Sequence, residues 1–182
     1  MTGHPQHDDV SVSRWRRVWR HMVTDHRDAA KLFPVETLKR LELATRHGEQ
    51  LHRGQVRLAI EASLPTANVR RGMTPRERAL EVFGLLRLWD TDANCGVLLY
   101  LLVADRAFEI IADRGIHARV GEAAWGEISE RIEARFRAGE FSQGAQQALV
   151  EIGSLLALHF PRSARDAGDR ANEQPDAPVI IG

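Results

Sequence analysis

Side chains that carry oxygen ligands gather around one apolar stretch of the sequence. Asp90, Asp92 and Asn94 form the pattern D-x-D-x-N just before that stretch, and Asp113 follows the apolar segment that comes after it. A hard dication such as Ca²⁺ or Mg²⁺ needs several oxygen ligands, and a loop allows them to converge. These four residues are therefore candidate metal ligands. The alternative, which the residues alone favour, is an Asx-rich turn, because the segment lacks the glycine and the distal glutamate of an EF-hand.

A second group of candidate site residues is basic. Arg70 and Arg71 lie between a predicted strand and the predicted start of a helix at Thr74. Arginine side chains beside a helix N-terminus can bind an anion. Exposed charges on turns more commonly serve solubility, and this alternative stays open. Other charged residues expected at the same end of the sheet are Glu61, Asp105 and Arg106.

Other chemistries have little support in the sequence. Cys95 lies between a loop and a buried strand, so we expect it to be structural rather than nucleophilic. His117 could act as a general acid or base, but the sequence identifies no partner for it. The patterns G-x-x-x-x-G-K-[ST], G-x-G-x-x-G and H-E-x-x-H are absent, which excludes the common nucleotide-binding and zinc enzymes.

A strand, a helix and a second strand would position the candidate residues. Residues 55–62 alternate between apolar and polar types, which predicts a strand with one strongly apolar face. Residues 74–77, T-P-R-E, form a capping box with proline at the first helical position. Residues 97–103 are apolar throughout, as in a central strand covered on both faces. This order of elements predicts two parallel strands joined by a helical crossover.

The chain is then expected to return as a hairpin. A turn at residues 104–107 joins the central strand to an antiparallel strand at residues 108–112. Antiparallel pairing brings Asp113 to the end of the sheet where Asn94 leads into the central strand. The topology therefore predicts that Asp113 approaches the acidic loop.

Helical spacing of apolar residues predicts three helices that cover the sheet, at residues 35–47, 122–138 and 142–160. Gly48 is expected to end the first of them or the turn after it. His47 and His52 have the wrong spacing for a shared metal face, so we interpret both as surface residues. Trp89 is expected to be buried by the helix after the capping box.

The apolar end of the chain, Val179-Ile180-Ile181, could add to a sheet edge or enter a partner groove.

A further helix is predicted near the N-terminus, where tryptophans alternate with arginines. Trp15, Val18, Trp19 and Met22 fall on one face of a helix. The simpler interpretation, which we favour, is that the tryptophans pack onto the domain and the arginines face solvent. The alternative is a cationic helix that lies on an anionic membrane surface or a partner. In that case the contact residues would be Trp15, Arg16, Trp19 and Arg20.

Composition limits the class of protein. The chain has 182 residues, and 43% are hydrophobic, which favours one globular domain. Lys plus Arg equals Asp plus Glu at 25 each, so the charge gives no indication of nucleic-acid binding. A single cysteine suits a reducing compartment. With neither a signal-like segment nor a run of about 20 apolar residues, we expect a cytoplasmic protein or one peripheral to the inner face of the membrane.

Two motifs give the sequence a resemblance to a known family. They are W-D-x-x-x-N-x-G-V-L-L-Y at residues 89–100 and D-R-x-x-E-I-x-A-D-R-G-I at residues 105–116. Together with the order of elements, they resemble the TPM domain family over residues 34–161. The resemblance implies a three-layer α/β/α sandwich around a small mixed sheet of about three to four strands. Residues 1–33 would form an N-terminal extension and residues 162–182 a C-terminal tail.

The resemblance also implies a function. Some members of the family are described as phosphatases or nucleotide hydrolases with a divalent cation at acidic residues, and others act in membrane-associated assembly or repair. Asp90 and Asn94 match the acidic-amide loop of the family, and Gly115 matches a glycine after the third strand. Cys95 stands where a second asparagine is usual, so one oxygen donor is missing. Asp113 and Arg114 replace a glycine and a tyrosine, which adds a carboxylate and a cation at the same end.

The expected function is therefore binding of Ca²⁺ or Mg²⁺ and of a phosphorylated small molecule, with weak phosphatase or nucleotide hydrolase activity as one possibility. The metal ligands would be Asp90, Asp92, Asn94 and Asp113, and Arg114 would neutralise phosphate charge. The alternative is a non-catalytic adaptor, or a membrane-associated assembly or repair factor, that acts through the N-terminal helix or the C-terminal tail.

Overall fold

A computed structural model of the chain describes residues 7–90, 95–162 and 175–181. Within these residues the sheet has four strands in the order β3-β2-β1-β4. β1 (Gln55–Glu61) pairs in parallel with β2 (Gly96–Leu102), and β2 pairs antiparallel with β3 (Ala107–Ala112). These are the pairings that the sequence predicts. β2 is buried along its whole length, as its continuous apolar run indicates.

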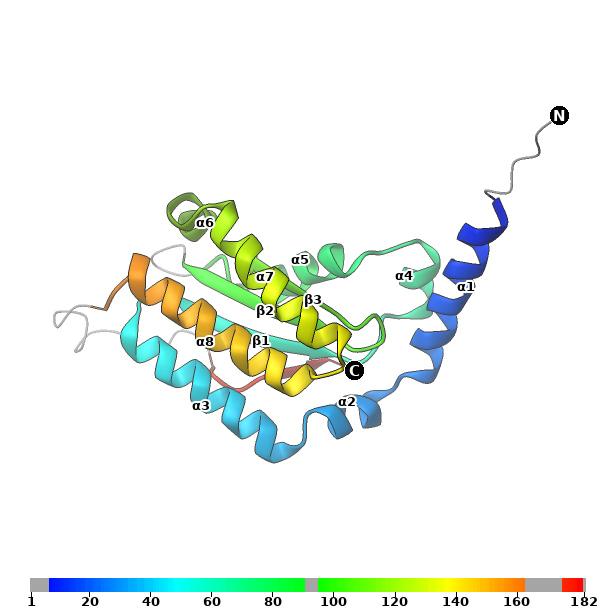
Figure 1. Cartoon of the computed structure of the whole chain (residues 1–182), viewed down its shortest axis with the longest axis horizontal. Helices are drawn as coiled ribbons and strands as arrows, with labels where there is room; N and C mark the ends of the chain where they lie inside the picture. Colours follow the sequence, from blue (N-terminus) through cyan, green and yellow to red (C-terminus); the bar gives the residue numbers. More distant parts are fainter. Residues whose placement is uncertain (1–6, 91–94, 163–174, 182) are drawn as a thin grey trace.

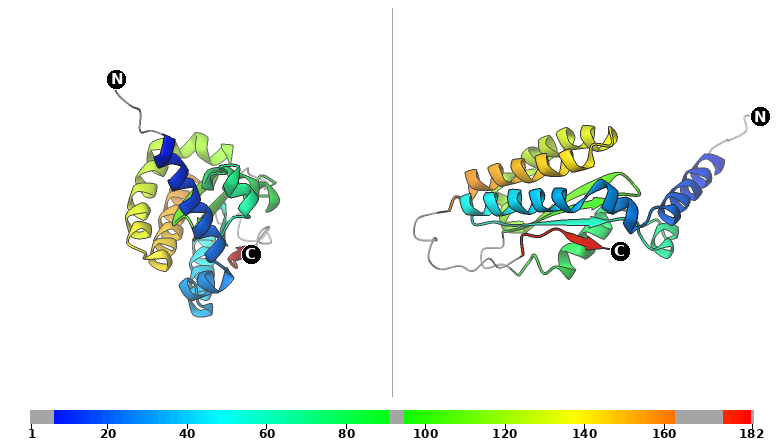
Figure 2. Two further views of the ribbon diagram at one scale, coloured as in Figure 1. Left: turned by 90° about the vertical axis from the view of Figure 1, so that its right-hand side faces the viewer. Right: turned by 90° about the horizontal axis from the view of Figure 1, so that it is seen from below.

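The last apolar residues of the described chain complete the sheet. β4 (Val179–Ile181) pairs in parallel with β1, opposite Ala59, Ile60 and Glu61 (Figure 2). This is the sheet-edge alternative of the two that the sequence leaves open. Because these residues already pair with β1, they are not a free segment for a partner.

Helices cover both faces of the sheet and make three layers, as predicted (Figure 1). On one face α3 (Val35–Leu51), α7 (Glu122–Arg137) and α8 (Phe141–His159) bury Leu58 and Leu99. On the other face α5 (Pro75–Leu85) covers Tyr100 and its neighbours. Shorter helices lie beside them, namely α2 (His26–Leu32), α4 (Thr66–Arg70) and α6 (Arg114–Val120). None of the helices within the described ranges is long and apolar enough to cross a membrane.

The start of α5 has the predicted capping box. The Thr74 side chain accepts a hydrogen bond from the Glu77 amide, and the Glu77 carboxylate accepts one from the Thr74 amide at 2.7 Å. Pro75 occupies the first helical turn, where its missing N–H costs nothing. The box fixes where the crossover helix begins.

Three predictions about residues in or near the last turns of helices are wrong. Gly48 lies inside α3 rather than at its end, and a Cβ there would be in van der Waals contact, at 3.8 Å, with the Cα of Gly153 in α8. His52 is buried rather than exposed, and its Nδ1 lies 3.0 Å from the Gly54 carbonyl oxygen. Trp89 is 53% exposed, and it is the neighbouring Leu88 that is fully buried.

Candidate functional site

Asp113 lies where the topology predicts. It follows β3 directly, and its amide donates a hydrogen bond to the Gly96 carbonyl oxygen at 2.9 Å. Gly96 is the first residue of β2, so Asp113 is adjacent to the point where the acidic segment joins the sheet. Asp90 is exposed after the C-terminal turn of α5, and its amide donates to the Arg87 carbonyl oxygen at 3.0 Å. The other two predicted metal ligands, Asp92 and Asn94, lie outside the described residues.

The two carboxylate oxygens of Asp113 have different surroundings. Oδ1 accepts a hydrogen bond from the Arg114 amide at 2.6 Å, which makes Asp113 the N-cap of α6. Oδ2 is buried and has no hydrogen-bond partner among the described residues. Capping of α6 therefore uses one carboxylate oxygen, and the other can still accept a hydrogen bond or bind a cation. Arg114, the predicted phosphate partner, is exposed next to it.

The described residues alone do not form a complete metal centre. Within these parts of the chain no group of three or more His, Cys, Asp or Glu side chains could hold a metal ion. Cys95 is buried, and its Sγ donates to the Arg53 carbonyl oxygen at 3.2 Å, which agrees with the predicted structural role. A cation at this end would thus need oxygens from the segment between α5 and β2 in addition to Asp113.

At the opposite end of the sheet, where the sequence suggested an anion site, α1 (His7–Val23) contacts the turn between β2 and β3. Asp105, in the turn between β2 and β3, accepts hydrogen bonds from Arg17 Nη2 at 2.8 Å and from Arg20 Nη2 at 3.0 Å. Arg17 Nη2 also donates to the Met73 carbonyl oxygen at 2.7 Å. The Asp105 carboxylate, which the sequence placed among candidate site residues, therefore holds α1 against the domain.

His21 completes this anchor. Its Nδ1 accepts a hydrogen bond from the Leu64 amide at 2.9 Å, and its Nε2 lies 3.1 Å from Asp105 Oδ1. Since Nδ1 accepts, Nε2 is the nitrogen that carries a proton toward the carboxylate. Burial raises the pKa of Asp105, but hydrogen bonds from His21 and Arg17 outweigh it and hold that pKa well below its ordinary value. Asp105 is therefore ionised at neutral pH.

The favoured interpretation of the N-terminal helix is wrong in its orientation. The arginine and histidine face contacts the domain, whereas Trp15 is 66% and Trp19 is 65% exposed. The sequence did contain a signal for this arrangement. Positions 14, 17, 18 and 21 follow the i, i+3, i+4, i+7 spacing of one helical face, and all of these except Val18 are basic.

Other residues of that end make hydrogen bonds within the domain. Arg71 donates to Asn68 Oδ1 at 2.8 Å, and the Arg70 carbonyl oxygen accepts from Arg14 Nη2 at 2.9 Å. Glu61 accepts from the Tyr100 hydroxyl at 2.7 Å and from Arg78 Nε at 2.9 Å. With these partners Glu61 is a structural carboxylate at the end of β1.

Comparison with known proteins identifies the family. A three-layer α/β/α sandwich around an open mixed sheet is the class that the fold defines. The family model described as TPM domain matches residues 26–155, and the chain therefore belongs to the TPM domain family. This confirms the resemblance seen in the sequence motifs.

A solved structure agrees with this assignment. The chain is similar to the BA42 protein of the psychrophilic bacterium Bizionia argentinensis, known from NMR, with 28% sequence identity and a TM-score of 0.71. The similarity covers 82% of this chain and 95% of BA42. Among curated proteins, none matches this chain.

Proposed function

We propose that this TPM domain binds a divalent cation, Ca²⁺ or Mg²⁺, beside Asp113. The observation that supports the proposal is the buried Oδ2 of Asp113, which has no hydrogen-bond partner among the described residues. A buried carboxylate oxygen without a partner is costly, and a hard cation is a partner that carboxylates bind well. Asp90, Asp92 and Asn94 would supply further oxygens, because their segment enters the sheet at Gly96, next to Asp113.

The second part of the proposal is a phosphorylated small molecule as ligand. Arg114 follows Asp113 and is exposed, so its guanidinium can pair with a phosphate group that reaches the cation. A bound cation would polarise the phosphoryl group and lower the pKa of a water molecule. Hydrolysis would additionally require a general base, so binding is the activity that the geometry supports.

Thermal unfolding of the purified protein tests the cation. We expect Ca²⁺ or Mg²⁺ at about a hundred times its dissociation constant to add ~2.7 kcal/mol to the free energy of unfolding, relative to protein with chelator. Asp113→Asn should remove this gain while keeping the α6 cap, since asparagine caps helices as well as aspartate does.

Asp25→Asn is the matched control. Asp25 caps α2 through its side chain and is remote in sequence from the acidic segment, so this variant should respond to the cation like the wild type. Absence of a shift in the wild type, or an equal shift in Asp113→Asn, would contradict the proposal.

A further inference from the structure

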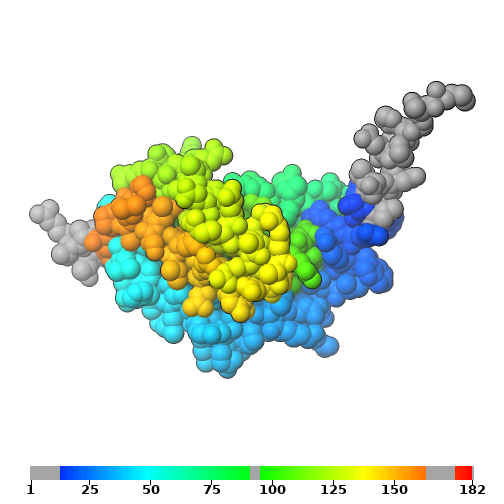
Figure 3. Space-filling model, in the orientation of Figure 1, coloured from blue at the N-terminus to red at the C-terminus, as the bar shows by residue number. Residues whose placement is uncertain are grey.

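The outer side of α1 is apolar and exposed. Trp15, Trp19, Met22 and Val23 are each more than half exposed, while Arg17, Val18 and His21 face the domain. Figure 2 shows α1, in blue, reaching beyond the sheet, and Figure 3 shows its blue part at one end of the molecule. Large apolar side chains that gather on one exposed helix face indicate a surface that another phase or molecule covers.

The same surface is cationic, although the chain as a whole has no formal net charge. Asp105 offsets one of these positive charges through its ion pairs with Arg17 and Arg20, and its own side chain is only 8% exposed. The exposed guanidiniums on and beside α1 are those of Arg14, Arg16, Arg20, Arg70 and Arg71.

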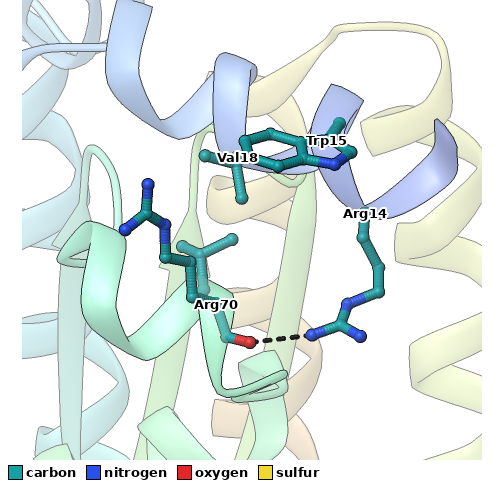
Figure 4. A pocket seen from close by; sticks show the side chains of 5 residues that line it. Arg14, Trp15, Val18 and Arg70 are labelled. Carbon is teal, nitrogen blue, oxygen red and sulfur yellow. Dashed lines mark hydrogen bonds between the residues drawn. The ribbon is translucent and has the colours of Figure 1, made fainter. Parts of the chain in front are cut away.

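A groove continues this surface between α1 and α4. It has a volume of about 300 Å³, and Val18 and Val69 line it together with Trp15 (Figure 4). Arg14 and Arg70 also line it, and Arg14 is fixed by its hydrogen bond to the Arg70 carbonyl oxygen. Apolar side chains with guanidiniums beside them suit the interfacial part of an anionic lipid, where phosphate and hydrocarbon meet.

We propose that α1 docks this protein on an anionic lipid bilayer. Trp15, Trp19 and Met22 would enter the interfacial region, where tryptophan is favoured, and the arginines would contact lipid phosphates. A nucleic acid or an acidic protein surface would match the charge but leave the apolar side of α1 without a matching partner. Because α1 extends beyond the rest of the chain, it can reach a flat surface along one side.

This inference goes beyond the cation proposal and does not depend on it. α1 lies at the end of the sheet where β1 and β2 finish, whereas Asp113 lies where β2 begins. Vesicle binding measured in the presence of chelator therefore tests the α1 surface alone.

The experiment is sedimentation of the full chain with vesicles of phosphatidylcholine, with and without phosphatidylglycerol. We expect binding only to vesicles that contain phosphatidylglycerol, together with a blue shift of tryptophan fluorescence. Trp15→Ala and Trp19→Ala should each lower the partition coefficient about tenfold, because each removes a large apolar side chain from the interface. Arg16→Glu should lower it at least about fivefold, since one basic residue near an anionic membrane contributes about that factor.

Matched controls exclude general effects of these substitutions. Trp89→Ala removes another half-exposed tryptophan, and Lys39→Glu reverses an exposed positive charge on α3, and both should bind like the wild type. Far-UV circular dichroism verifies that each variant is folded. The proposal is overturned if the protein does not sediment with phosphatidylglycerol vesicles. It is also overturned if binding disappears with salt but is unchanged in Trp15→Ala and Trp19→Ala.

Discussion

Two buried titratable side chains lie at the C-terminal end of α3. Glu49 Oε1 accepts a hydrogen bond from the Val56 amide at 3.0 Å, and burial, aided by a hydrogen bond with Asp176, raises the pKa of Glu49 to about 8. Burial also lowers the pKa of His52 to about 4, because the charged imidazole loses its hydration. At neutral pH the folded protein thus keeps both residues uncharged. The sequence indicates neither, since the burial comes from packing of α3 on α8 and on the chain around Gly54.

These pKa shifts predict how stability depends on pH. Stability from protonated Glu49 is present below its ordinary pKa of 4.5 and is lost as the pH rises to about 8. Stability from neutral His52 is present above 6.5 and is lost as the pH falls to about 4. The two effects oppose each other between 4.5 and 6.5. We therefore expect the free energy of unfolding to fall as the pH rises from 6.5 to about 8, by up to ~1.4 kcal/mol per pH unit.

Denaturant unfolding of Glu49→Gln between these pH values measures this contribution. Glutamine keeps an oxygen for the Val56 amide but cannot ionise, so the variant should lose the fall in stability and exceed the wild type at pH 8. Glu42→Gln, on the more exposed side of the same helix, should retain the fall. If Glu49→Gln shows the same pH dependence as the wild type, Glu49 is not the responsible group.

At the scale of elements, Leu88, which follows α5, lies against Gly96 at the start of β2 without room for a side chain. A Cβ added at Gly96 would lie 2.0 Å from the Leu88 carbonyl oxygen. Both atoms belong to the backbone or are fixed to it, so rotation of a side chain cannot relieve the overlap. Gly96 is therefore required for the close approach of Leu88 to β2.

Gly96→Ala should lower the free energy of unfolding by about 3 kcal/mol or more, or prevent folding, because overpacked backbone must shift. Chemical denaturation measures the change. Gly126→Ala is the matched substitution, since nothing lies within 4 Å of a Cβ at this exposed position of α7. Alanine there should stabilise the protein by up to about 1 kcal/mol, because it is the better helix former. Equal stability of the two variants would mean that Leu88 and the start of β2 separate easily.

At the scale of the whole molecule, the chain is a three-layer body with α1 attached at one end. The attachment depends on Asp105, which joins Arg17, Arg20 and His21 to the turn between β2 and β3. The two apolar clusters of the body lie around the sheet, and Val18 is the one residue of α1 among their buried members. Release of α1 is therefore expected before global unfolding.

Asp105→Ala should release α1 from the body, because it leaves several cationic or polar partners without an acceptor. We expect amide hydrogen exchange within residues 13–23 to increase at least about tenfold, with little change in β2. Glu109→Ala, which removes the less buried ion pair between Glu109 of β3 and Arg76, should leave exchange in α1 unchanged. Unchanged protection of α1 in Asp105→Ala would show that other contacts hold the helix.

The sequence by itself determined the features that depend on neighbours along the chain. The T-P-R-E box fixed the start of α5, the apolar run gave β2, and the order of elements gave the parallel and antiparallel pairings. The same register placed Asp113 beside Gly96. Short helices such as α6 escaped prediction, because seven residues show too little periodicity.

Only the tertiary structure decided which side of each element faces the body. Trp15 and Trp19 seemed suited to the core, yet Asp105, some 85 residues away in sequence, draws the basic face of α1 inward. Glu61 likewise pairs with Arg78 of α5, 17 residues away in sequence. The physical reason is the same in both cases. A buried carboxylate is stable only when hydrogen-bond donors surround it, and these donors can come from residues that are distant in sequence. Local sequence periodicity does not identify such donors.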